Sequence, residues 1–162
     1  MTDQIANRYK PDSHFMEIAL KEAHLSLAES HIPVGAVIVF DNQIRAKGRN
    51  RVLEVKSDLA HAEMQAMLSA QQILFEHKGE CTLYTTMEPC MMCLGAMINI
   101  QIGRLVIAKS HSGIGAVGLA ESLFYYRSRL PKVDRGIMEQ KSHELIVEYV
   151  KRTGQRQDLL GM

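Results

Sequence analysis

Cysteine, long apolar runs and net charge are all scarce in this sequence. Only three of its 162 residues are cysteine, and an odd number in a chain without an export signal favours metal or redox chemistry over a disulfide framework. The first residues show no charged segment followed by an apolar core, as a secretory signal would. No apolar run approaches the roughly 18 residues of a membrane span. We therefore expect no membrane partner and a cytoplasmic location.

Repeats, low-complexity stretches and linkers are also lacking. A formal net charge of +1 supplies no general electrostatic argument for or against a nucleic-acid partner. Hydrophobic residues make up 46% and charged residues 23% of the chain, as in soluble globular proteins, so disorder of the whole chain is not expected. Residues 1–162 are predicted to form a single domain, with residues 1–11 flexible and residues 153–162 a tail.

The pattern of apolar and turn residues predicts alternating helices and strands. A first helix follows Asp12 or Ser13 as N-cap, and Pro89 is predicted to open a later one. The predicted helices cover residues 16–27, 60–74, 90–100, 121–126 and 142–152, and the predicted strands cover 33–40, 43–47, 81–86 and 104–108, with 135–138 ambiguous. This order favours a mixed sheet with helices on both faces.

Two short clusters carry the candidate chemistry. The first contains His61 and Glu63, and the second contains Cys90 and Cys93. Cys90 and Cys93 are three positions apart at a predicted helix start, which places both sulfurs on one face and lowers their pKa through the helix dipole. Three protein ligands and an open fourth position are typical of catalytic zinc. We therefore predict one Zn²⁺ per chain, held by His61, Cys90 and Cys93.

Glu63 is the candidate that stays off the metal and moves protons. His61 and Glu63 are two positions apart, so on a regular helix they would point to opposite sides. They can converge only at the helix entry, where the backbone is not yet regular and Asp58 is the expected cap.

A C-x-x-C pair also occurs in structural zinc half-sites and in thiol redox pairs. A structural zinc site normally needs a fourth protein ligand. The remaining histidines lack a matching spacing, and Cys81 is expected to be a small buried apolar residue. A redox pair would not account for His61 and Glu63. The sequence therefore favours a catalytic metal site.

The chain resembles the cytidine deaminase superfamily, above all the branch with bacterial tRNA adenosine deaminases and small guanine and cytosine deaminases. The pattern H-x-E…P-C-x-x-C is a known signature of zinc-dependent base deaminases. The resemblance covers about residues 12–120 and is carried by Pro33–Val39, Gly48–Arg51, Ala60–Glu63, Thr82–Cys90 and Met92–Ile98. It implies a three-layer α/β/α sandwich around a mixed five-stranded sheet, and a homodimer.

The resemblance also implies roles for individual residues. Glu63 would take a proton from the attacking water, then protonate the ring nitrogen and the leaving ammonia. Asn50 matches a position that hydrogen-bonds the substrate, and the backbone N–H of Ala62 lies beside it. For Asn50, a turn residue after a strand is the alternative.

The substrate depends on the less distinctive residues after Lys109. Residues 109–118 are glycine-rich and only mildly basic, and residues 151–158 are mixed in charge, whereas an RNA-binding protein would be expected to show a stronger basic cluster. A local patch could form from Arg127, Arg129, Lys132 and Arg135, although such residues more often belong to a solvated loop. Residues 32–35 and 96–98, in contrast, resemble the tRNA deaminases.

These observations favour a free nucleobase or nucleoside as the substrate of a hydrolytic deaminase. A tRNA loop, with adenosine converted to inosine, is the first alternative. A zinc-stabilised binding domain without turnover is the second, and the intact catalytic set argues against it.

Overall fold

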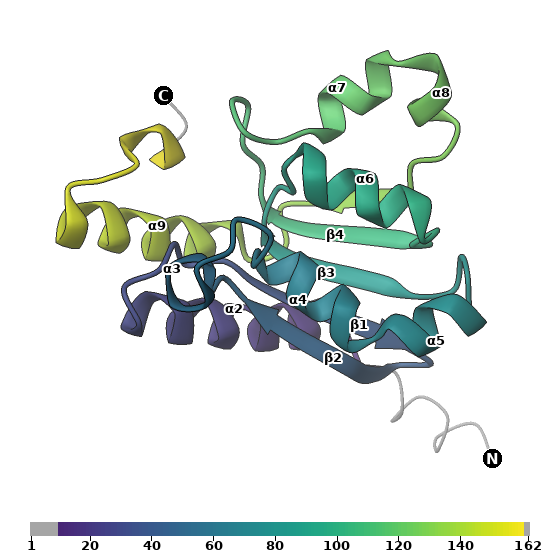
Figure 1. The fold of residues 1–162 in the computed structure, drawn as a ribbon, viewed down its shortest axis with the longest axis horizontal. Coiled ribbons are helices and arrows are strands. Elements are labelled where there is room, and N and C mark those ends of the chain that lie inside the picture. Colours follow the sequence, from purple (N-terminus) through teal and green to yellow (C-terminus); the bar gives the residue numbers. More distant parts are fainter. Residues whose placement is uncertain (1–9, 161–162) are drawn as a thin grey trace.

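A five-stranded mixed sheet forms the middle layer of the computed structural model, which describes residues 10–160 (Figure 1). The strands are β1 (Gly35–Phe40), β2 (Gln43–Arg49), β3 (Thr82–Met87), β4 (Arg104–Lys109) and β5 (Lys132–Arg135). They are ordered β2-β1-β3-β4-β5, with β1 antiparallel to β2 and β3 and with β4 parallel to β3 and β5. The mixed five-stranded sheet that the resemblance implied is confirmed.

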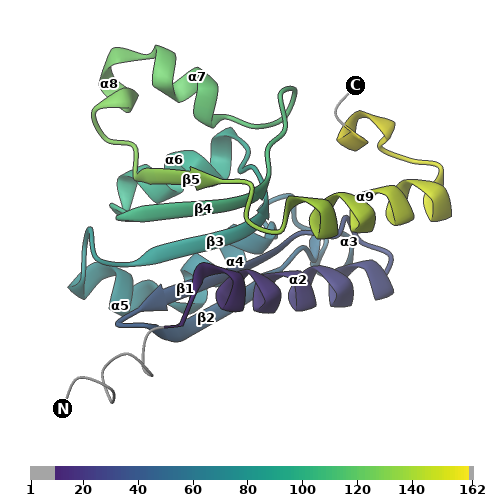
Figure 2. The same ribbon diagram turned by 180° about the vertical axis from the view of Figure 1, so that it is seen from behind.

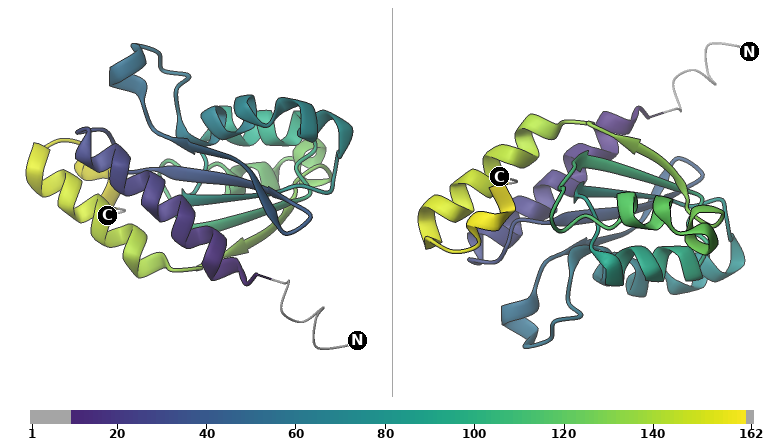
Figure 3. Two further views of the ribbon diagram at one scale, coloured as in Figure 1. Left: turned by 90° about the horizontal axis from the view of Figure 1, so that it is seen from below. Right: turned by 90° about the horizontal axis from the view of Figure 1, so that it is seen from above.

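Helices cover both faces of this sheet. On one face α2 (Asp12–Ala28) and α9 (Glu139–Thr153) lie side by side, and on the other lie α4 (Ala62–Ser69), α5 (Gln71–Glu76) and α6 (Met91–Asn99) (Figures 2 and 3). The described connections contain the short helices α3 (Val52–Val55), α7 (Val117–Ser122) and α8 (Phe124–Arg127), and the 3₁₀ helix η1 (Gln157–Leu160) follows α9. None of the described helices is long and apolar enough to cross a membrane. Because helices cover both faces of the mixed sheet, the predicted α/β/α sandwich is confirmed.

The core lies between these layers. Interior strands contribute side chains that are fully buried, including Ile38 of β1, Leu83 of β3 and Leu105 of β4. The strand β1 is buried along almost its whole length, which accounts for its continuous apolar sequence, since both of its faces are covered by helices.

Several predicted boundaries are wrong. The helix predicted over residues 60–74 is interrupted at Ala70, whose N–H is shared between the carbonyls of Ala66 and Met67, so that the chain tightens and restarts as α5. The predicted helix over 121–126 is divided between α7 and α8. Residues 132–135, rather than the ambiguous 135–138, form the edge strand β5, and the last helix begins at Glu139 instead of 142.

The predicted helix starts also need correction. The N-cap of α4 is His61 and not Asp58, and the N-cap of α6 is Cys90, so that Pro89 precedes the cap instead of opening the helix. Pro11 takes the cap position of α2, and Asp12 is its first residue. The prediction that residues 1–11 are flexible concerns mainly residues 1–9, which lie outside the described residues.

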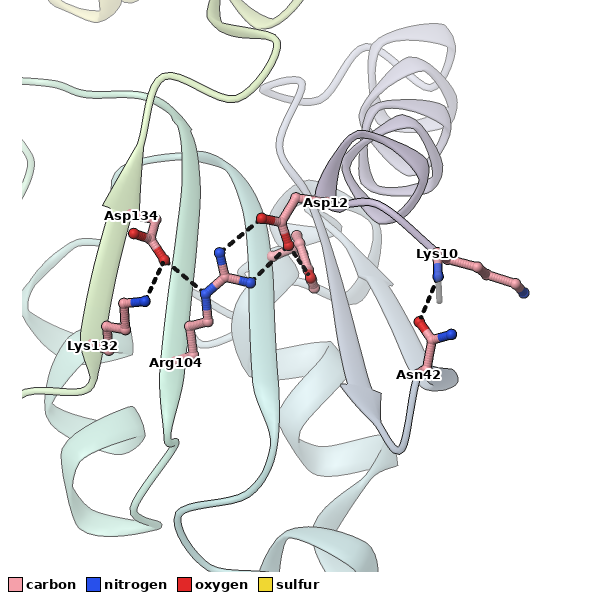
Figure 4. A network of polar contacts seen from close by, with 7 residues as sticks. Lys10, Asp12, Asn42, Arg104, Lys132 and Asp134 are labelled. Carbon is pink, nitrogen blue, oxygen red and sulfur yellow. Dashed lines mark hydrogen bonds and ion pairs between the residues drawn. The ribbon is translucent and has the colours of Figure 1, made fainter. Parts of the chain in front are cut away.

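Asp12 is held by an ion-pair network instead of capping its helix (Figure 4). Two nitrogens of Arg104 donate to the two carboxylate oxygens of Asp12 at 2.7 Å, and the Tyr84 hydroxyl donates to one of them at 2.7 Å. The third guanidinium nitrogen of Arg104 donates to Asp134 at 2.7 Å. The network joins the start of α2 to β4 and β5, and the hydrogen bonds from Arg104 lower the pKa of Asp12 below its ordinary value.

A close approach between β2 and α4 positions one side of the site described below. A Cβ atom added to Gly48 would lie 2.1 Å from the carbonyl oxygen of Ala62 and 2.6 Å from the backbone nitrogen of Ala66. Only glycine therefore allows β2 to pack this closely against the first turn of α4.

Candidate active site

The starts of α4 and α6 face each other at one end of the sheet. His61 has extended backbone angles (φ −68°, ψ 153°) before α4, and Cys90 has similar angles (φ −70°, ψ 171°) before α6. The His61 Nδ1 atom lies 3.6 Å from the Cys90 Sγ atom and 3.6 Å from the Cys93 Sγ atom. The structure thus brings together the three residues that the sequence predicted as ligands.

This donor set suits a zinc ion. Zinc bonds of about 2.0–2.1 Å to nitrogen and 2.3 Å to sulfur at tetrahedral angles require a nitrogen–sulfur separation of about 3.6 Å. The observed separations match that value, and the three candidate ligand atoms lie within 4.8 Å of one another. Among the described residues this group contains three members, which leaves the fourth tetrahedral corner for another ligand.

The two thiols of this group differ in acidity. Hydrogen bonds from the Cys93 thiol and from His61 lower the pKa of Cys90 to about 4. The hydrogen bond to Cys90 and burial raise the pKa of Cys93 above its ordinary value. Cys90 therefore offers a thiolate at neutral pH, and Cys93 would release its proton when a cation binds between the sulfurs.

Glu63 lies beside this group without belonging to it. Its side chain is only 3% exposed. One carboxylate oxygen accepts a hydrogen bond from the Thr85 hydroxyl at 3.2 Å, and the other lies 3.7 Å from the Cys93 sulfur. Burial raises the pKa of Glu63 above its ordinary value, which suits a carboxyl group that takes up and returns a proton near neutral pH.

A cavity opens in front of these residues. Its walls include the predicted substrate contacts Asn50 and Ala62, and the complete lining is Ile32, Val34, Asn50, His61, Ala62, Glu63, Met87, Glu88, Cys90, Ile114, Arg156 and Leu159. An apolar cavity with a few convergent polar groups is the usual form of a small-ligand site.

Asn50 makes the hydrogen bond of a turn residue and also lies in the cavity wall. Its side-chain oxygen accepts a hydrogen bond from the Val52 N–H at 3.2 Å, as a turn residue would. The residue is nevertheless buried in the cavity wall, and its amide N–H₂ group remains as the donor that it can offer to a ring. Ala62 supplies a backbone N–H from the first turn of α4, where such groups have no partner within the helix.

The sequence prediction missed Glu88, which shapes the far wall of the cavity. Its carboxylate accepts hydrogen bonds from the backbone N–H groups of His111 at 3.0 Å and Val117 at 3.3 Å. A Cβ atom on Gly115 would lie 2.3 Å from the Glu88 carboxyl carbon, so glycine is needed for this approach. A charged residue directly before Pro89 in a buried segment was the available signal.

Arg156 and Leu159 were also missed, because residues 153–162 were expected to be a simple tail. Leu159 is only 1% exposed and both residues line the cavity. The apolar pair Leu159-Leu160 in an otherwise polar segment was the only local sign of this packing.

The predicted basic patch lies elsewhere. Arg129 stacks on Tyr125, and both line a cavity with Gly103, which precedes β4. Cys90 and Cys93 follow the opposite, carboxyl end of the neighbouring parallel strand β3. Arg135 pairs with Glu121 at 3.5 Å. None of the four predicted patch residues lines the cavity of the candidate site.

Comparison with known proteins identifies the family. A model of the cytidine and deoxycytidylate deaminase zinc-binding region matches residues 9–109. The chain belongs to this family. As a zinc-binding member of the deaminase family, it is a hydrolase of C–N bonds. The predicted zinc cofactor and the predicted hydrolytic deaminase activity are therefore confirmed.

Relatives of this deaminase act on different substrates. The chain is 33% identical over 143 residues to the tRNA-specific adenosine deaminase of Buchnera aphidicola subsp. Schizaphis graminum, covering 86% of this chain and 94% of that one. A solved structure from a study of tRNA:A34 deaminases is 35% identical, with a TM-score of 0.72 over 82% of this chain and 98% of that chain. Guanine deaminase from Nitrosomonas europaea is 25% identical, with a TM-score of 0.73 over 86% and 84% of the two chains.

Proposed function

We propose that this deaminase converts adenosine to inosine in a tRNA loop. The observation that carries this proposal is the similarity to tRNA-specific adenosine deaminases over nearly their whole length. The free nucleobase or nucleoside that the sequence favoured is supported less well, because the guanine deaminase that shares the fold is less similar in sequence. The tRNA loop, which was the first alternative from the sequence, therefore replaces the free nucleobase or nucleoside as the proposed substrate.

In this proposal His61, Cys90 and Cys93 hold the zinc ion. When bound, zinc would supply the Lewis acidity that activates water. The ligand set carries two sulfurs and one imidazole nitrogen, so two thiolates balance the charge of the ion. His61 and Cys90 line the same cavity as Glu63, so zinc held there would supply this chemistry beside the Glu63 carboxylate.

Glu63 is the proposed catalytic residue. Its carboxylate accepts a proton from the attacking water, whose oxygen forms a bond to the ring carbon that carries the amine. Glu63 returns this proton to the ring nitrogen, then transfers the remaining hydroxyl proton to the amine. The carbon–nitrogen bond breaks, ammonia leaves and a carbonyl remains. The hydrogen bond from Thr85 holds the carboxylate in position.

Asn50 and Ala62 are the proposed substrate contacts. The Asn50 side-chain N–H₂ and the Ala62 backbone N–H can donate to acceptor atoms of the base, and both line the cavity with Glu63. The apolar side chains of Ile32, Val34 and Ile114 surround the ring, where they exclude water from the reacting carbon.

The test is release of ammonia and formation of inosine from a substrate panel. The panel contains an adenosine-bearing tRNA anticodon stem-loop, adenosine, guanine and cytosine. The parent protein should deaminate the stem-loop best, and Glu63→Gln should lose about a thousandfold or more in rate. Glu76→Gln, which changes an exposed glutamate of α5, is the matched control and should retain the parent rate.

Two outcomes would contradict this proposal. If the zinc-loaded parent is no more active than Glu63→Gln on every substrate, the chain is the binding domain without turnover that the sequence left open. If guanine or another free base is preferred over the stem-loop at all salt concentrations, the tRNA assignment is wrong while the deaminase chemistry stands.

We also propose that the protein is a homodimer, as the family resemblance implied. The helices α4, α5 and α6 carry exposed apolar side chains, including Leu68 (58% exposed) and Phe75 (75% exposed), beside a cavity lined by Met64, Met67 and Ile100. A second copy packed on this face would remove these side chains from water. Sedimentation should show a dimer that dissociates in Phe75→Glu, and Leu25→Glu on the opposite face should remain a dimer. A monomeric parent would contradict the proposal.

The single domain spanning residues 1–162 and the cytoplasmic location remain predictions. Limited proteolysis and fractionation of cells that express the protein would test them.

A further inference from the structure

The chain after α9 returns to the active site as a short segment, residues 154–160, which we call the C-terminal strap. Gly154 ends α9 with a positive φ of 66°, and η1 follows. In Figure 1 the strap turns back above the end of α9, toward the loop that follows β4. The His111 Nε2 atom of that loop is 2.8 Å from the Asp158 carbonyl oxygen. Buried Leu159 completes the attachment.

The catalytic cavity does not end at the strap. A second cavity adjoins it, and the two share Ile32, Asn50, His61 and Arg156 in their walls. The second cavity extends past α3, where Val52 and Leu53 line it. A free base needs only the first cavity. The second provides room for whatever is covalently attached to that base.

Arg156 lies at the junction of these two cavities. Its guanidinium group pairs with Asp158, with nitrogen–oxygen distances of 2.9 Å and 3.0 Å. The two side chains are 44% and 54% exposed, and a pair as exposed as this one contributes little to stability. Arg156 can therefore exchange Asp158 for another anion, and its planar fork matches a phosphate group.

Charge around the second cavity favours one position for such an anion. Among the residues that line it, Asp58 carries negative charge and Arg156 carries positive charge. A phosphate is therefore repelled from the side with Asp58 and attracted to the side formed by the strap.

We propose that Arg156 is a substrate-binding residue that contacts a backbone phosphate next to the target nucleotide, and that the second cavity holds an adjoining nucleotide of the same strand. This inference rests on the proposed tRNA activity and deepens it, because it names the group that distinguishes an RNA substrate from a free base. A contact with a phosphodiester is also expected to strengthen binding without reading the base.

The test combines an Arg156→Gln substitution with neutral phosphates. Binding of the stem-loop is measured in the Glu63→Gln background, which prevents turnover, over a series of salt concentrations. Arg156→Gln should weaken binding roughly tenfold and lower the salt slope by about one. Its zinc content should equal that of the parent, and its rate should fall much more on the stem-loop than on free adenosine. Arg152→Gln is the matched control, because Arg152 is exposed on α9 and pairs with Glu148.

Single methylphosphonate linkages on either side of the target adenosine identify the contact. One of these neutral linkages should weaken binding to the parent as much as Arg156→Gln does, and should have no further effect on the variant. The affinity of Arg156→Lys for the stem-loop should lie between those of the parent and Arg156→Gln. Lysine keeps the positive charge but lacks the planar guanidinium group.

The outcomes separate this inference from the proposed function. If the parent deaminates the stem-loop and Arg156→Gln binds it with the same affinity and salt slope, the phosphate contact is wrong and the tRNA activity stands. If Arg156→Gln loses zinc, or loses as much activity on adenosine as on the stem-loop, its role is structural and the inference is overturned. If the parent does not deaminate the stem-loop, both proposals fail.

Discussion

The helix starts that carry the candidate chemistry are held very differently from the C-terminal strap. His61 and Glu63 begin a helix that packs against β2 with no space for a side chain at Gly48, and Glu63 and Cys93 are almost completely buried. The strap is held mainly by one hydrogen bond from His111 and by the side chain of Leu159. The groups proposed for proton transfer and metal binding therefore lie on rigid elements, and Arg156, which is proposed to bind a substrate phosphate, lies on a segment with few attachments.

The largest effect should come from removing a ligand at the helix starts. Cys90→Ser should reduce zinc from about one per chain to nearly none and abolish deamination, because affinity depends on all three ligands. Metal analysis of the purified proteins measures this. Cys81→Ala should keep its zinc, since Cys81 is buried outside the ligand group. Equal zinc in Cys90→Ser and the parent would refute the ligand assignment, and loss of zinc in Arg156→Gln would refute the distinction between the two regions.

A smaller effect is expected from crowding the contact that positions α4. Gly48→Ala should lower the free energy of unfolding by about 2–3 kcal/mol, because backbone atoms of α4 must move to admit the methyl group. Urea unfolding measures the change. The control is Gly118→Ala in α7, where an added Cβ meets nothing within 4 Å. That change should be neutral or slightly stabilising, because alanine is the better helix former. A Gly48→Ala protein as stable as the parent would show that the packing of α4 on β2 is not rigid.

The smallest effect is expected at the Asp12–Arg104 pair, which lies outside both regions. The folded-state pKa of Asp12 is lowered by its hydrogen bonds to Arg104. Its contribution to stability is therefore present above the unfolded pKa of about 4 and is lost as the pH falls through the lower folded value. Asp12→Asn should cost about 1 kcal/mol at pH 7 and less at pH 3. Urea unfolding at both pH values measures this, and an equal cost at both would contradict it.

The sequence predicted best those features that depend on near neighbours. The spacing of Cys90 and Cys93 places both sulfurs at one helix start whatever surrounds them. The pairing of His61 with Glu63 required an irregular helix entry, and the extended backbone at His61 supplies one. The sheet and its helical layers followed from apolar patterns that span single elements.

Features that depend on distant contacts were predicted poorly. The residues around Ala70 are good helix formers, so nothing in their sequence indicated that the helix would end there. The edge strand β5 is partly exposed and contains Lys132, Asp134 and Arg135, so it lacks the apolar pattern of a buried strand. Its place in the sheet depends on pairing with β4 and on the bond between Arg104 and Asp134.

The amino-acid sequence alone was enough to indicate a zinc-dependent deaminase, because each of the two clusters that identify the chemistry is arranged by its own local helix start. The surroundings of the reacting base, in contrast, follow from the tertiary structure. The walls of the cavity come from loops and from a strap near the end of the chain, which meet through contacts such as His111 with Asp158. Such contacts join residues far apart in the sequence and leave little pattern in either segment alone. The position of Arg156, on which the proposed RNA contact depends, is set by contacts of this kind.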